Sequence, residues 1–125
     1  MQNGILKAFP DADLDVLWIW ISMMGDDTYA AAQKAAQKFK DKRVKQFFDP
    51  HQLAGRAFAK SLDSSKGIAW DIYFFYPVGA LWQDLPPSPE SWIHQLRDSW
   101  ADPSRLFEKE QLRIKLTETM KLLFP

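Results

Sequence analysis

The stretch "GIAWDIYFFYPVGALW", residues 67–82, is the densest apolar and aromatic run of the chain and decides the predicted fold. Its first part, residues 69–76, is rich in β-branched and aromatic side chains, which is typical of a strand. Pro77 and Gly79 follow, and these residue types favour a tight turn. We therefore predict a hairpin in which residues 80–83 return as the antiparallel partner. Alternation along the first strand predicts two sheet faces, one with Trp70, Ile72 and Phe74 and the other with Tyr73 and Phe75.

The composition is that of a single folded domain covering residues 1–125, with 46% apolar and 26% charged residues. The formal net charge is zero, which argues against binding to nucleic acid, because that needs a surplus of positive charge. The basic run "KFKDKRVK", residues 38–45, lies at a predicted helix end, where cations complement the helix dipole. The first residues lack a basic stretch followed by a long apolar run, so we expect no signal peptide, and the apolar run over residues 16–24 is about half the length of a membrane-spanning helix. We expect a soluble, cytoplasmic protein that does not bind membranes.

Helical and strand patterns alternate along the whole chain. The predicted elements are a helix over residues 3–9, a strand over 14–23, a helix from Asp26 or Asp27 to about Lys40, a strand from Val44, a helix capped by Asp49, the hairpin, a helix over 89–96 and a final helix from Pro103 or Glu108. This order predicts an α/β domain with a mixed sheet.

The order of elements resembles that of the thioredoxin-like superfamily, in the branch that holds the peroxiredoxins and thiol reductases. The likeness covers roughly residues 3–83 and rests on three segments, "DLDVLWIWISMMGDD" (13–27), "FFDPHQLAGRAFAKSL" (47–62) and "AWDIYFFYPVGALW" (69–82). The resemblance implies a three-layer α/β/α fold with a mixed sheet. It also implies that the sheet is incomplete at the N-terminus, because the family's active-site strand would lie ahead of residue 3.

The resemblance does not extend to the family's chemistry. Thiol redox activity is excluded because the chain has no cysteine, and the family's cis-proline is missing from the segment before residue 69. In the family, the missing strand lies between the counterparts of residues 14–22 and 69–76. Buried backbone groups without partners cost about 1–3 kcal/mol each, so we expect these strands to re-pair or a second copy to cover the gap in a homodimer. A truncated remnant of a thiol-disulfide oxidoreductase is an alternative origin.

The side chains that could contact a ligand lie in and after the predicted hairpin. Asp71 interrupts an apolar strand and either faces a ligand or pairs with an Arg or Lys from a neighbouring helix. Trp82 and Trp92 flank a proline-rich loop and are expected to be partly exposed. His94 follows Glu90 by four residues, which would place both on one face of the predicted helix. We name Asp71, Trp82, Trp92 and His94 as candidate ligand contacts.

No residue pattern predicts a catalytic residue, a metal site or a cofactor. A zinc site needs three or four ligands, and phosphate-binding glycine loops and nucleophile elbows are missing. The leading interpretation is a non-catalytic thioredoxin-like protein that acts by binding or self-association. A small-molecule binding domain with a pocket near residues 69–83 is one alternative. An enzyme without cysteine that uses Asp71, Glu90 and His94 is another.

Overall fold

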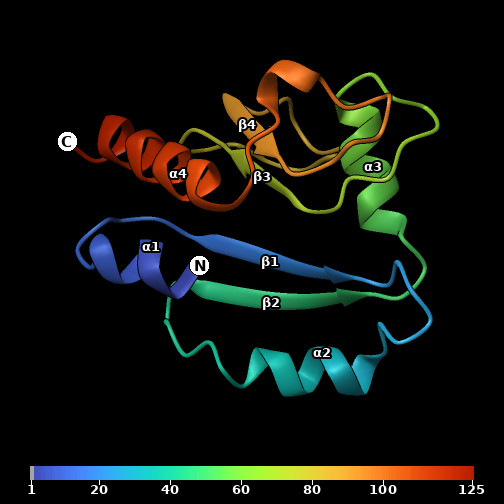
Figure 1. Ribbon diagram of the computed structural model, residues 1–125, viewed down its shortest axis with the longest axis horizontal. Coiled ribbons are helices and arrows are strands. Elements are labelled where there is room, and N and C mark those ends of the chain that lie inside the picture. Colours follow the sequence, from blue (N-terminus) through green and yellow to red (C-terminus); the bar gives the residue numbers. More distant parts are fainter. Residues whose placement is uncertain (1) are drawn as a thin grey trace.

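The computed structural model describes residues 2–125 and contains both helices and strands (Figure 1). The elements are α1 (Gln2–Ala8), β1 (Val16–Ile21), α2 (Tyr29–Ala36), β2 (Val44–Asp49), α3 (Leu53–Ser61), β3 (Ile72–Phe75), β4 (Ser91–His94), the 3-10 turn η1 (Pro103–Arg105) and α4 (Lys109–Leu123). The prediction of a mixed α/β chain is confirmed. In the part of the chain that is described, no helix combines the length and apolar character needed to cross a bilayer.

β1 and β2 form a parallel pair that is in register along its whole length, and α2 connects the two strands (Figure 1). One face of the pair is aromatic, because Trp18 and Trp20 stack with ring centroids 4.9 Å apart. The ring of Phe39, which follows α2, packs on the Trp18 ring with centroids 4.4 Å apart. The strands predicted over residues 14–23 and from Val44 are confirmed.

The helix α2 differs from its prediction at both ends. Its N-cap is Thr28, whose hydroxyl accepts a hydrogen bond from a backbone N–H of the first turn at 3.1 Å. The prediction that Asp26 or Asp27 caps it is wrong. The Asp27 carboxylate instead accepts two backbone hydrogen bonds from the turn before the helix, at 2.9 and 2.7 Å. The helix ends at Ala36, before the predicted end near Lys40.

The start of α3 is held by Asp49, the last residue of β2. Its carboxylate accepts three backbone hydrogen bonds from the first turn of the helix, from Leu53 (2.8 Å), Ala54 (2.9 Å) and Gly55 (3.2 Å). The first N–H groups of a helix have no acceptor inside the helix, and the buried Asp49 carboxylate supplies one. The predicted capping role of Asp49 is confirmed, although Gln52, in the left-handed region at φ 60°, occupies the N-cap position itself.

A single guanidinium, that of Arg43, joins the end of α1 to the start of β2. It forms hydrogen bonds with the Asp41 carboxylate at 2.7 and 3.0 Å. It also donates to the backbone carbonyls of Leu6 (3.0 Å), Phe9 (2.7 Å) and Ala12 (3.2 Å). These carbonyls lie at and just beyond the C-terminus of α1, where helical carbonyls lack partners, so Arg43 caps that helix.

The predicted hairpin is wrong in its second strand. The turn forms, since the Ala80 N–H donates to the Pro77 carbonyl at 3.2 Å and Gly79 has φ 85°. The chain that follows does not return as a strand. β3 pairs instead with residues 91–94, antiparallel, across a loop of fifteen residues, 76–90. The helix predicted over residues 89–96 is therefore wrong, because its centre is the strand β4.

The predicted strand over residues 69–76 is shorter, since β3 begins at Ile72 and Trp70 lies outside it. The predicted faces are confirmed for Tyr73, Phe74 and Phe75. Tyr73 and Phe75 pack against the core cluster of Ile93, Leu112 and Leu116, which joins β4 to α4. On the opposite face, the Phe74 ring stacks on Phe58 of α3 with centroids 5.0 Å apart. The β3–β4 pair thus lies between α4 and α3, and it holds the centre of this part of the molecule.

The strands form two separate two-stranded sheets among residues 2–125, one parallel and one antiparallel, instead of the single mixed sheet that was predicted (Figure 1). β1 does not pair with β3, so each of these two strands has one edge that pairs with no other strand among the described residues. Two-stranded sheets are only marginally stable unless a helix or another strand covers them.

Candidate functional site

His94, a predicted ligand contact, is fully buried. Its Nδ1 accepts a hydrogen bond from the Leu96 N–H at 2.9 Å, and its Nε2 lies 2.7 Å from the Asp102 carbonyl oxygen. Because a carbonyl only accepts, Nε2 carries the proton and the ring is neutral. Both ring nitrogens are occupied and no surface is exposed, so His94 holds β4 to the following loop.

Trp92 lies beside His94 on the same face of β4, with ring centroids 5.5 Å apart. The Arg105 guanidinium also lies over the indole, with its central carbon 5.0 Å from the ring centroid, and donates to the Trp92 carbonyl at 3.1 Å. This arrangement is a cation–π contact reinforced by a hydrogen bond. The Trp92 ring therefore contacts both the His94 ring and the Arg105 guanidinium.

Asp71 occupies a left-handed turn at φ 52°, immediately before β3. Its carbonyl accepts a hydrogen bond from the Gln95 N–H at 2.9 Å, which extends the pairing of β3 with β4 by one step. Partial burial of the carboxyl raises the pKa of Asp71. Within residues 2–125 it forms no ion pair, so the predicted pairing with an Arg or Lys is not found.

Trp82 is about half exposed, at 48%, and its ring meets Phe58 edge-on with centroids 5.0 Å apart. Phe58 also stacks on Phe74, the residue opposite Trp92 in the β3–β4 pair. Phe74, Phe58, Trp82 and Trp92 therefore form an aromatic layer on one face of this sheet.

The predicted site residues do not form one constellation of reactive groups. Glu90 and His94 do not share a helix face, because Glu90 precedes β4 and its N–H donates to the Phe75 carbonyl at 2.8 Å. No group of three or more metal-ligating side chains is present among the described residues. An acid–base site that uses Asp71, Glu90 and His94 has no geometric support, since the histidine ring nitrogens are both engaged.

The outer edge of β1 is a more promising binding feature. The Val16 N–H donates to the carbonyl of Arg43, just before β2, at 2.9 Å, and the Ser22 N–H donates to the carbonyl of Asp49, in β2, at 3.2 Å. Since the N–H groups of a strand alternate in direction, those of Leu17, Ile19 and Ile21 point to the outer edge. No strand pairs with that edge within residues 2–125.

The sheet face beside this edge is apolar and partly uncovered. Leu17 is 60% exposed and Phe47, on β2, is 53% exposed, although both lie in the middle of strands. Ile21, on the same face, lies close to α3 at Gly55. The helix thus covers one end of the face, and the Leu17–Phe47 end is left open to solvent.

Comparison with known proteins found no match among family models, curated proteins or solved structures.

Proposed function

We propose that this chain is a non-catalytic binding module that acts by self-association, with the outer edge of β1 pairing with the β1 edge of a second copy. The observation that carries the proposal is an apolar strand of six residues that is paired on one side only. Exposed strand edges of this kind are templates for pairing with another chain. The free edges of β1 and β3 also fit a thioredoxin-like arrangement in which a further strand would lie between them.

Two copies of β1 are complementary to each other. An antiparallel pair with its two-fold axis at Ile19 places Leu17 opposite Ile21 of the other copy. The outward N–H and C=O groups of these three residues would then form about six hydrogen bonds between the copies. The half-exposed Leu17 side chain would gain an apolar cross-strand neighbour, which stabilises a sheet by about 0.2–1 kcal/mol per pair.

The residues of β1 include none of those that protect an edge strand from association. Natural edge strands are protected by lysine, proline or a bulge, whereas the residues of β1 are Val, Leu, Trp, Ile, Trp and Ile. The formal net charge of the chain is zero, so two copies do not repel each other through their overall charge. A second copy is therefore the occupant that this edge fits best.

Light scattering after size exclusion, over a range of concentrations up to about 100 μM, tests the proposal. We expect a dimer for the unaltered chain. Leu17→Lys adds a charge at the edge and should weaken the dimer by tenfold or more. Leu122→Lys is the matched control, because Leu122 is 82% exposed at the end of α4, and it should leave the dimer unchanged.

Hydrogen exchange identifies the surface that associates. In a β1–β1 dimer the outward amides of Leu17, Ile19 and Ile21 exchange slowly, and their protection falls when the protein is diluted to monomer. The amides of Trp18 and Trp20 point to β2 and should stay protected at both concentrations. A monomer at every concentration, or a dimer whose Leu17, Ile19 and Ile21 amides exchange fast, would refute the proposal.

A further inference from the structure

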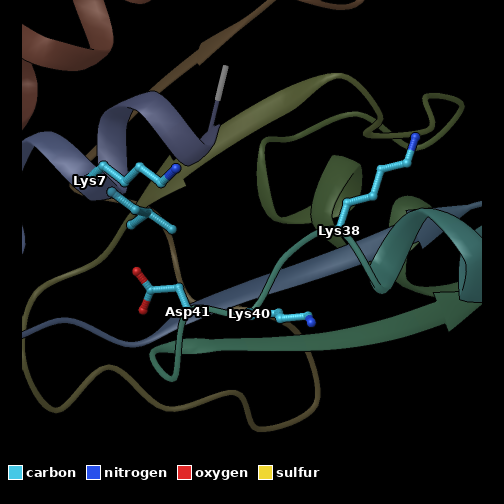
Figure 2. Close-up of a pocket in the computed structure, with 5 residues that line it drawn as sticks. Lys7, Lys38, Lys40 and Asp41 are labelled. Atoms are coloured by element: carbon cyan, nitrogen blue, oxygen red, sulfur yellow. The ribbon is translucent and has the colours of Figure 1, made fainter.

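We propose that a hollow between α1 and the loop before β2 binds a small phosphorylated molecule through Lys7, Lys38 and Lys40. The hollow has a volume of about 350 Å³ and is lined by these lysines together with Leu6 and Asp41 (Figure 2). This volume lies near the lower end of the range for small-molecule sites, about 300–1,000 Å³. The site is separate from the β1 edge and does not depend on self-association.

The hollow is assembled from two segments that are distant in the sequence. Lys7 comes from the last turn of α1, and Lys38 and Lys40 come from the loop that follows α2. Figure 2 shows Lys7 above Lys40 and Asp41, with the ammonium groups of Lys38 and Lys40 both pointing away from Asp41. A lysine side chain is a flexible stem with a charge at its tip, so Lys38 can swing towards an anion that enters.

The positive charge in the hollow is not neutralised by the protein. Lys7, Lys38 and Lys40 form no ion pair within residues 2–125. The one carboxylate in the lining, Asp41, is bound by the Arg43 guanidinium at 2.7 and 3.0 Å. Hydrogen bonds from the side chain and backbone of Arg43 lower the pKa of Asp41 to about 2, so this carboxylate stays charged and engaged with Arg43. Three ammonium groups therefore remain for an external anion.

A phosphate group matches this arrangement better than other anions. Lysine binds phosphate as a point charge, and several ammonium groups around a hollow suit an ion with more than one negative charge. Leu6, only 8% exposed, supplies an apolar contact for the organic part of the molecule. A nucleic acid would need a longer basic surface than a chain with a formal net charge of zero supplies.

Titration of the isotope-labelled protein with inorganic pyrophosphate, followed by amide chemical shifts, tests the proposal. We expect saturable shifts at Lys7, Lys38 and Lys40, with a Kd at or below about 1 mM in low salt. Lys7→Gln or Lys40→Gln should each weaken binding about fivefold, the upper range for an exposed charge pair. The double variant should weaken it more than either single change.

Lys121→Gln is the matched control, because Lys121 is an exposed lysine on α4, outside the hollow. It should leave the pyrophosphate affinity unchanged, and the amide spectrum of each variant reports whether it is folded. Shifts that fail to saturate, shifts centred elsewhere, or equal weakening by Lys121→Gln would overturn the proposal. Tighter binding of a single-stranded oligonucleotide than of pyrophosphate would overturn it as well, in favour of a nucleic-acid surface.

Discussion

Replacement of His94 tests whether the β3–β4 face is held together by a structural histidine. The ring is fully buried, and its Nδ1 is the acceptor for the Leu96 N–H. Leu96 is itself buried at 3% exposure, so its N–H would lose its partner without gaining water. That loss costs about 1–3 kcal/mol. The Asp102 carbonyl suffers less, because it also accepts from the Arg105 N–H at 3.1 Å.

For His94→Ala we add the loss of ring packing against Trp92 to the unpaired N–H, which gives a destabilisation of about 3–4 kcal/mol. His94→Asn places an amide oxygen near the position of Nδ1, so it keeps an acceptor for Leu96 and should cost about 1–2 kcal/mol less than Ala. Urea unfolding monitored by tryptophan fluorescence measures both values.

His51→Ala is the matched control, because His51 is the other histidine of the chain and is exposed. It should change the free energy of unfolding by no more than about 0.5 kcal/mol. A cost below about 1 kcal/mol for His94→Ala, or an equal cost for the Asn and Ala variants, would refute the assigned hydrogen-bonding role.

Two further predictions concern the aromatic layer on the same sheet. Phe74→Ala should destabilise the fold by about 3 kcal/mol, and Trp82→Ala by clearly less, because Trp82 is half exposed and meets Phe58 only edge-on. Urea unfolding of the two variants that gave the opposite order would contradict the assigned packing. Tyr76→Phe should be neutral or stabilise by up to about 1 kcal/mol, because the Tyr76 hydroxyl is buried with no hydrogen-bond partner. Burial raises the pKa of Tyr76 to about 12. The fold should therefore lose stability as the pH rises from about 10 to 12, because the unfolded chain releases the Tyr76 proton first. Ultraviolet titration should show a tyrosine that ionises near pH 12 in the unaltered chain, and its absence from the Tyr76→Phe titration confirms the assignment.

The local chemistry of the sequence was sufficient to predict several elements. β1 and β2 were predicted from their apolar and aromatic runs, and the Asp49 cap from an acidic residue placed just ahead of a helical pattern. The assignment of Phe74 and Phe75 to opposite faces followed from the two-residue period of a strand. Each of these features depends on residues that are close together in the chain.

The errors involve partners that are distant in the chain. The Pro77–Gly79 turn forms, but the strand opposite β3 is Ser91–His94, which was predicted as a helix because Ser88 and Pro89 are typical of a helix start. A four-residue segment carries too little periodicity to choose between helix and strand. Pairing with β3 decides the choice, and local patterns do not contain that information.

The candidate site residues show the same division. Asp71, Trp82, Trp92 and His94 were chosen for their residue types, which the sequence determines. Burial decided their roles, and the structure uses His94 as an internal hydrogen-bonding group. The sequence indicated only part of the lysine-lined hollow. Lys38 and Lys40 belong to the basic run over residues 38–45, whereas no pattern marked Lys7.

The sequence by itself determined that this chain contains no thiol chemistry and that it has a strand–helix–strand unit over residues 16–49. The tertiary structure alone decided which strands pair, which edge stays free and where Lys7 meets Lys38 and Lys40. The physical reason is the range of the interactions. Caps, turns and periodicity act over a few residues, whereas strand pairing and the assembly of a charged hollow depend on contacts between segments more than fifteen residues apart.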